Sequence, residues 1–224
     1  MKGRPVRKVF QAELQTIGEE LTEMATLVAD AMERAYASYA EADTELAQEV
    51  IAADARVDFM QNQLDERAID VLALQGPVAS DLRMIVGSLR MSASLERMGD
   101  LARHIAQLAR LRYPANVAPD SLAPVFAEMA DLDVQIARKL VTLLETRDLD
   151  IAADIVTLNT RIDDLHASVF KLVAAPEWSE SAPRTADVTL TSRYMERYGD
   201  HGVSVARKVN YLVTGEWEPG SSER

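Results

Sequence analysis

The sequence contains no cysteine. Disulfide bonds, thiolate catalysis and zinc sites built on cysteine are therefore excluded, and carboxylate oxygen and imidazole nitrogen remain as the strong metal ligands. The segment 1–5 lacks the apolar stretch of a signal peptide, and no run approaches the roughly 18 consecutive apolar residues of a membrane helix. These absences predict a cytoplasmic protein without membrane insertion.

Glycine and proline are also scarce, with 9 and 8 residues among 224. Because helix breakers are few while Ala, Leu, Glu, Arg and Met are abundant, the composition favours helix over almost the whole chain. The formal net charge of −12 argues against nucleic acid as a partner, since binding to phosphates needs clustered Lys and Arg. An acidic surface suits cations, or basic patches on a partner protein.

Two stretches of the first half show the apolar spacing of amphipathic helices. Apolar residues recur every three or four positions over residues 14–35 and again over residues 46–64. Asp43 precedes the second stretch and is expected to cap it, because a carboxylate accepts hydrogen bonds from the free N–H groups of a first turn. Gly76 and Pro77 then break the pattern, and Ser80 is expected to be the N-cap of a third helix.

The second half of the sequence repeats the first. The motif Glu-Arg-Met-Gly-Asp at residues 96–100 returns as Glu-Arg-Tyr-Gly-Asp at residues 196–200. Residues 50–58 likewise align with residues 155–163. The repeat therefore covers more than one helix.

A cluster of helix breakers at residues 113–124, rich in proline, separates the two copies. We therefore predict an all-α fold of two tandem antiparallel three-helix bundles. The first unit is expected at residues 1–115, the second at 116–214 and a disordered tail at 215–224.

Each copy of the motif places a glutamate and an aspartate four residues apart on one helix face, a spacing at which like charges destabilise a helix. When the helices of the first unit fold back around the turn near Pro77, Asp58 lies at the level of Glu96 and Asp54 at the level of Asp100. We call these four residues the first acidic layer. Carboxylates gathered at one height resist ionising together unless a cation is present.

The second unit places its acids in the same way. Its turn brings Asp163 opposite Glu196 and Asn159 opposite Asp200, and we call these four residues the second acidic layer. Asn159 occupies the position of Asp54 in the repeat, so this layer has one negative charge fewer than the first.

Residues 77–106, in which Asp-Leu-Arg at residues 81–83 opens a helix, resemble the PhoU family of accessory and regulatory proteins in phosphate transport. Residues 193–201 resemble the second signature of that family, and the likeness extends over the chain up to Gly215. The resemblance implies a six-helix fold whose Glu/Asp-x-x-x-Asp motifs bind metal clusters. Iron, zinc, manganese, magnesium and calcium are the candidate ions, and the sequence does not choose among them.

The resemblance carries over to individual residues of this chain. It implies metal contacts at seven carboxylates: Asp54, Asp58, Glu96, Asp100, Asp163, Glu196 and Asp200. Because Asn159 stands where the family pattern has an acid, the first acidic layer is expected to be the better metal site. His104, four residues beyond Asp100, is a further candidate ligand.

In functional terms, the resemblance implies a cytoplasmic regulator that restrains phosphate uptake and the phosphate-starvation response. The implied partners are a membrane sensor histidine kinase and the ATPase subunit of the phosphate ABC transporter, and a homodimer is implied. An accessory protein of another phosphate transporter and a general metal-binding scaffold stay open as alternatives.

Other interpretations of the charged residues also stay open. Arg97 and Arg103 flank Asp100 at helical spacing, so ordinary surface salt bridges are an alternative to metal binding. Arg83 matches a family feature, and an ion pair at the helix start is the simplest role for it.

Catalysis finds little support in the motifs. Gly99 and Gly199 stand where a di-iron bundle enzyme has histidine, and the sequence has no Walker A loop or G-x-S-x-G motif. We expect no enzyme, with a metal-dependent phosphohydrolase as the alternative of a different class.

Overall fold

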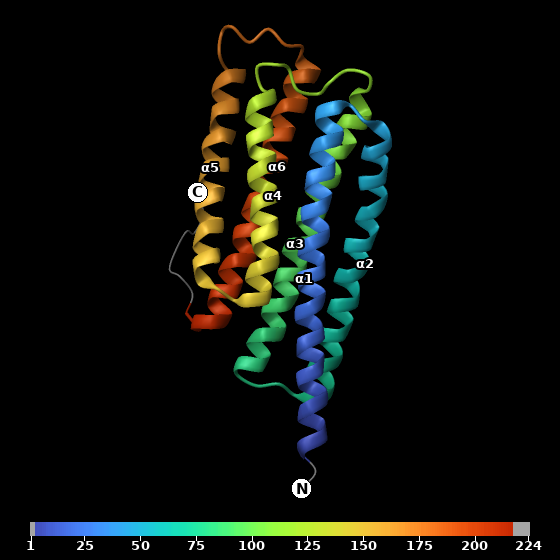
Figure 1. The fold of residues 1–224 in the computed structure, drawn as a ribbon, viewed down its shortest axis with the longest axis vertical. Coiled ribbons are helices and arrows are strands. Elements are labelled where there is room, and N and C mark those ends of the chain that lie inside the picture. The colour runs from blue at the N-terminus through green and yellow to red at the C-terminus, as the bar shows by residue number, and fades with distance from the viewer. Residues whose placement is uncertain (1–2, 217–224) are drawn as a thin grey trace.

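The computed structural model describes residues 3–216 of the chain, and side chains from residue 9 onward. Helices account for the regular structure of this part, which confirms the all-α prediction. They are α1 (Gly3–Glu41), α2 (Thr44–Gln75), α3 (Ser80–Arg112), α4 (Ala123–Thr146), α5 (Leu149–Val173) and α6 (Ala182–Thr214). They stand side by side along the long axis of the molecule (Figure 1). None of these helices is long and apolar enough to cross a membrane.

The helix boundaries follow the capping chemistry of the sequence, with one exception. Asp43 caps α2 by accepting hydrogen bonds from the N–H groups of Glu45 and Leu46, as predicted, and Asp148 caps α5 by accepting one from the N–H group of Asp150. The prediction that Ser80 caps α3 is wrong. Ala79 holds the cap position with a positive φ of 49°, so Ser80 already belongs to the first turn.

The internal repeat is visible in the ion pairs between helices. Two pairs join α1 to α2, and two pairs join α4 to α5 at positions 105 residues further along the chain. They are Arg34–Glu49 with Lys139–Asp154, and Arg56–Glu23 with Arg161–Glu128. The helices of both units are therefore held in the same register.

The two units share one hydrophobic core. Helix α1 packs on α4, and α3 packs on α6, in addition to the contacts within each unit. Tyr39 of α1 meets Phe126 of α4 edge to face, with ring centroids 6.2 Å apart. Tyr198 of α6 is fully buried and donates a hydrogen bond of 2.8 Å to the carbonyl oxygen of Val28. Side chains of both units thus complete each other's packing.

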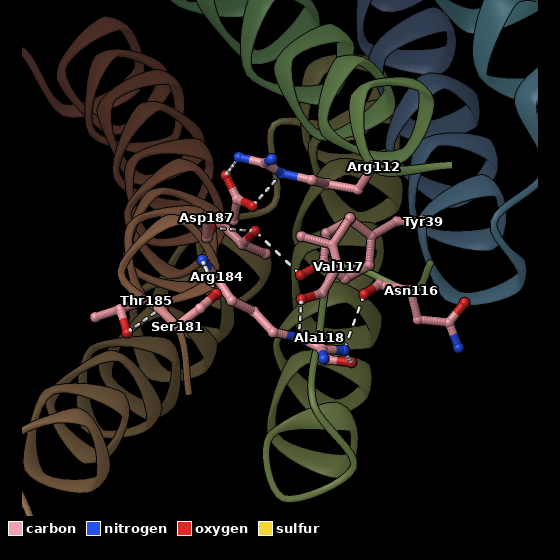
Figure 2. A network of polar contacts seen from close by, with 10 residues as sticks. Tyr39, Arg112, Asn116, Val117, Ala118, Ser181, Arg184, Thr185 and Asp187 are labelled. Atoms are coloured by element: carbon pink, nitrogen blue, oxygen red, sulfur yellow. Dashed lines mark hydrogen bonds and ion pairs between the residues drawn. The ribbon is translucent and has the colours of Figure 1, made fainter. Parts of the chain in front are cut away.

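The upper end of the α3–α6 pair, as drawn in Figure 1, is closed by polar contacts (Figure 2). The guanidinium of Arg112 at the end of α3 binds the buried carboxylate of Asp187 on α6. Arg184 donates hydrogen bonds to backbone carbonyls of the loop between α3 and α4, at Asn116, Val117 and Ala118. Every cation that faces this junction in Figure 2 therefore has an acceptor.

Candidate functional site

The first acidic layer already contains a cation, the guanidinium of Arg103. Its Nε lies 2.6 Å from Oδ2 of Asp54 on α2, and its Nη2 lies 2.5 Å from Oδ1 of Asp100 on α3. Arg97 adds a second contact to Asp100, at 2.7 Å. The mirror arrangement of Asp54 and Asp100 is confirmed, with an arginine as the link between them.

The electrostatics of this layer reflect the arginine. Burial raises the pKa of Asp54, against the effect of its hydrogen bond from Arg103. Burial also acts to raise the pKa of Asp100, but the bonds from Arg103 and Arg97 outweigh it and leave this pKa lowered. Glu96 has a raised pKa because it is partly buried and lies near Asp100, while Asp58 is exposed. Arg103 thus bridges two of the four acids, and Glu96 has a longer ion pair of 3.6 Å with Arg97.

The second acidic layer brings its carboxylates together without such a bridge. One carboxylate oxygen each from Asp163 on α5 and from Glu196 and Asp200 on α6 lie within 4.8 Å of one another. Val203 stands where the repeat places Arg103, 100 residues earlier, so no guanidinium reaches across. This is the one cluster of at least three potential metal ligands among the residues that the structure describes.

Repulsion within this cluster is partly relieved from outside. Arg193 holds Glu196 with contacts of 2.7 and 2.8 Å, and Arg197 approaches Asp200 to 3.7 Å. Nevertheless, burial and the charge of Asp200 raise the pKa of both Asp163 and Glu196. Asp163 and Glu196 therefore resist ionisation, which a bound cation would favour.

Asn159 contacts the cluster as the mirror arrangement predicts. Its side-chain nitrogen donates to Oδ1 of Asp200 over 3.4 Å. Its own oxygen is buried and has no hydrogen-bond partner within the described part of the chain. Gly199 makes room for this side chain, because a Cβ at that position would lie 2.2 Å from the Asn159 oxygen.

Asp133 of α4 is an acid near this layer that sequence reasoning missed. It is 0% exposed, and neither carboxylate oxygen has a partner among residues 9–216. Burial, and to a lesser extent the charge of Glu196, raise its pKa well above the usual range. A signal was available, because Asp133 interrupts an apolar seam at the position where the repeat, 105 residues earlier, has Val28.

His104 packs its ring against Tyr194, with centroids 5.0 Å apart. Burial, together with the nearby charge of Arg103, lowers its pKa. Its Nδ1 is buried without a hydrogen-bond partner in the described structure. Its role as a ligand stays a prediction.

The donor sets of the two layers differ in how well they suit a metal ion. Asp163, Glu196 and Asp200 offer only hard oxygen ligands at short mutual distances, a set suited to magnesium, manganese, calcium or iron. In the first layer, Asp54 and Asp100 are already bound by Arg103. The geometry thus favours the second layer, whereas the charge count of the sequence favours the first.

Comparison with known sequences identifies relatives over nearly the full chain. The family model described as the PhoU domain matches residues 21–109 and 126–209, one stretch in each half. A protein of Mycobacterium tuberculosis named phosphate-specific transport system accessory protein PhoU homolog 2 is 38% identical over 210 residues, which is 94% of this chain and 99% of that protein. A PhoU homolog 1 of Mycobacterium leprae is 37% identical over 212 residues, covering 95% and 96% of the two chains.

Solved structures agree with this result. The crystal structure of PhoU from Pseudomonas aeruginosa superposes with a TM-score of 0.83 at 27% identity, covering 92% of this chain and all of that one. The phosphate transport system regulatory protein PhoU from Streptococcus pneumoniae gives 0.84 at 23% identity, covering 94% of this chain and all of that one, and supports the fold alone. The domain model matches both halves, the mycobacterial proteins are more than a third identical, and the fold is shared with solved PhoU structures. This chain therefore belongs to the PhoU family.

Proposed function

We propose that this protein is a cytoplasmic regulator of phosphate homeostasis. In this role it restrains phosphate uptake and the phosphate-starvation response by bridging the phosphate ABC transporter and a sensor histidine kinase. The proposal rests on the similarity to a protein named as an accessory of phosphate-specific transport. The two chains are 38% identical, and the match covers 99% of that protein. No enzymatic step forms part of the proposal.

The gene's loss tests this role directly. In cells grown with plentiful phosphate, we expect deletion to raise phosphate uptake and the expression of phosphate-regulated genes. Reintroduction of the wild-type gene should restore both. Unchanged uptake and expression in the deletion strain would contradict the proposal.

Partner capture separates the regulator from the alternatives. The tagged protein is expected to retain the ATPase subunit of the phosphate transporter and a sensor histidine kinase from lysate, and to behave as a homodimer in solution. Retention of a different phosphate transporter would instead indicate an accessory of that system. Capture of neither would favour a general metal-binding scaffold.

We further propose that the second acidic layer binds a divalent cation in this regulator. Asp163, Glu196 and Asp200 would hold the ion, and Arg193 donates hydrogen bonds to both carboxylate oxygens of Glu196. When bound, the ion supplies a positive charge that stabilises the ionised forms of Asp163 and Glu196, whose pKa values are raised without it. The chain's contribution is a preformed set of oxygen ligands on two adjacent helices.

Metal analysis of matched variants tests the assignment. Protein purified without chelator or metal-affinity resin is compared with a Glu196→Gln/Asp200→Asn variant and with the corresponding Glu96→Gln/Asp100→Asn variant. We expect the second-layer variant to lose most of its bound metal and the first-layer variant to retain more. Equal metal content in the wild type and in both variants would overturn the proposal.

A further inference from the structure

A pocket at the lower end of the α3–α6 pair lies apart from both acidic layers. A cavity of about 340 Å³ opens there between the start of α3 and the end of α6. Three cationic side chains line it, from Arg83, Arg90 and Lys208, beside an apolar wall that includes Leu82, Val86 and Tyr211. None of the described residues that line it is acidic, although acids outnumber bases by 36 to 24 in the chain.

The cations of this pocket have no counter-charge within the described structure. Arg83 and Arg90 form no ion pair with a carboxylate there, so the ion pair expected for Arg83 at the helix start is not observed. Lys208 donates to the carbonyl oxygen of Ser204 at 3.1 Å and to its hydroxyl at 2.5 Å, and both acceptors are neutral. Burial, and then the charge of Arg90, lower the pKa of Lys208.

The opposite end of the same helix pair shows that this arrangement is not required by the fold. There, Arg112 is paired with Asp187 and Arg184 is bound by three backbone carbonyls (Figure 2). The positions that match the pocket cations in the other unit, 100 residues away, are all uncharged: Pro183, Leu190 and Leu108. The three cations are thus peculiar to one end of the molecule, and no carboxylate among residues 9–216 pairs with them.

We propose that this pocket binds a phosphorylated small molecule, with its phosphate held by Arg83, Arg90 and Lys208 and its apolar or aromatic part against Leu82, Val86 and Tyr211. Guanidinium groups present paired N–H donors that match phosphate oxygens, and an ammonium adds a point charge. A bound dianion removes the repulsion between Arg90 and Lys208. The volume lies at the lower end of the ~300–1,000 Å³ range of small-molecule pockets, which leaves space beyond the phosphate.

This site goes beyond the proposed regulatory role and shares no residue with the proposed metal site. The failure of one proposal therefore leaves the other standing. A ligand here would contact both halves of the repeat at once, through α3 and α6.

Titration calorimetry on the intact protein at neutral pH and low salt tests the pocket. Phenyl phosphate and adenosine monophosphate serve as probes, beside adenosine, orthophosphate and vesicles with anionic phospholipid headgroups. We expect at least one of the two organic phosphates to bind more tightly than orthophosphate, with an affinity that falls as salt is raised, and adenosine not to bind. Binding of neither organic phosphate overturns the proposal, and so does binding to vesicles alone or orthophosphate binding of equal strength.

Variants locate the binding. Arg90→Gln and Lys208→Gln each remove one cation of the pocket, and we expect each to weaken binding at least tenfold. Arg207→Gln removes an equal charge from an exposed neighbouring position on α6 and should change binding less than twofold. Far-UV circular dichroism and the unfolding midpoint show whether each variant is folded. Equal binding by folded Arg90→Gln, Lys208→Gln and Arg207→Gln proteins would place the ligand elsewhere.

Discussion

The two acidic layers occupy equivalent places in a repeated fold, yet they treat their charges in opposite ways. In the first layer Arg103 joins Asp54 to Asp100, whereas in the second Val203 takes the place of the arginine and Asn159 that of Asp54. A tally of acids therefore does not describe how each layer holds its charges. The layers differ in where the guanidinium groups lie: Arg103 joins two acids of the first layer, whereas Arg193 and Arg197 each contact a single acid of the second.

Removing the bridge should give the largest effect. Arg103→Val introduces the residue of the second unit and leaves Asp54, whose side chain is only 8% exposed, without its cation. We expect the free energy of unfolding without metal to fall by about 2–3 kcal/mol, because an unpaired charge then stays buried. Urea denaturation measures the change, and added Mn²⁺ should restore much of the loss.

Arg97→Val is the matched control, since it removes another contact to Asp100 from a side chain that is 61% exposed. It should alter stability by less than about 0.5 kcal/mol. If both variants lose the same stability, the bridge by Arg103 is not what distinguishes the layers.

The buried acid of the second unit should give the next largest effect, with the opposite sign. Asp133→Val installs the residue type found at Val28 in the first unit and removes a carboxyl group that has no hydrogen-bond partner among residues 9–216. We expect the free energy of unfolding to rise by about 1–3 kcal/mol, since burying an unbonded polar group is unfavourable. Asp131→Val, at an exposed position of the same helix, is the control and should show little change.

The pH dependence of this gain follows from the raised pKa of Asp133. Between the ordinary value of 3.8 and the raised folded value, the native state binds more protons than the unfolded state, so stability falls as pH rises. The advantage of Asp133→Val over the wild type should therefore grow with pH in this window, by up to about 1.4 kcal/mol per unit. Denaturation at pH 5 and pH 7 measures it, and an advantage that shrinks with pH would exclude a buried, protonated Asp133.

The glycines of the two motifs offer a smaller contrast. A Cβ at Gly199 would meet the Asn159 oxygen at 2.2 Å, whereas at Gly99 the Asp54 oxygen lies at 3.0 Å. We expect Gly199→Ala to be less stable than Gly99→Ala by about 1 kcal/mol, since the gain in helix propensity is common to both and the crowding is not. Thermal unfolding of the two variants measures their stabilities. A Gly99→Ala protein less stable than the Gly199→Ala protein would contradict the prediction.

The surface pairs should give the smallest effect and no contrast. Arg56→Ala and Arg161→Ala break ion pairs at matched positions of the two units. Each should cost less than about 0.5 kcal/mol, because these side chains are about half exposed or more and their charges are screened. A loss of stability well above this in one variant alone would show that the two matched ion pairs contribute unequally to stability.

Much of this comparison was predictable from spacing alone. The fold-back of each helix pair placed Asn159 level with Asp200 and Asp54 level with Asp100, and the hydrogen bond and the arginine bridge confirm both. Helix caps are local, so Asp43 was identified correctly. The cap of α3 was missed by one residue, because Ala79 adopts a positive φ that is typical of glycine or asparagine and not of alanine.

Interactions between distant segments were not predictable in the same way. Spacing along α3 pairs Arg103 with Asp100, but its bond to Asp54 depends on the separation of two helices, which periodicity does not define. An apolar stripe shows that a helix face is buried without showing against what, so the packing of α1 on α4 and of α3 on α6 was not foreseen. Asp133, whose carboxyl group has no hydrogen-bond partner in the described structure, was also missed, although its position in an apolar seam, matched by Val28 in the repeat, was a usable signal.

The shared core has a consequence for how the chain folds during synthesis. Because α1 packs on α4 and α3 on α6, the first half leaves the ribosome with apolar faces whose partners are not yet made. It is expected to stay incompletely packed until α6 is available, and then to form one cooperative unit with a single unfolding transition. A doubled sequence thus yields one folding unit.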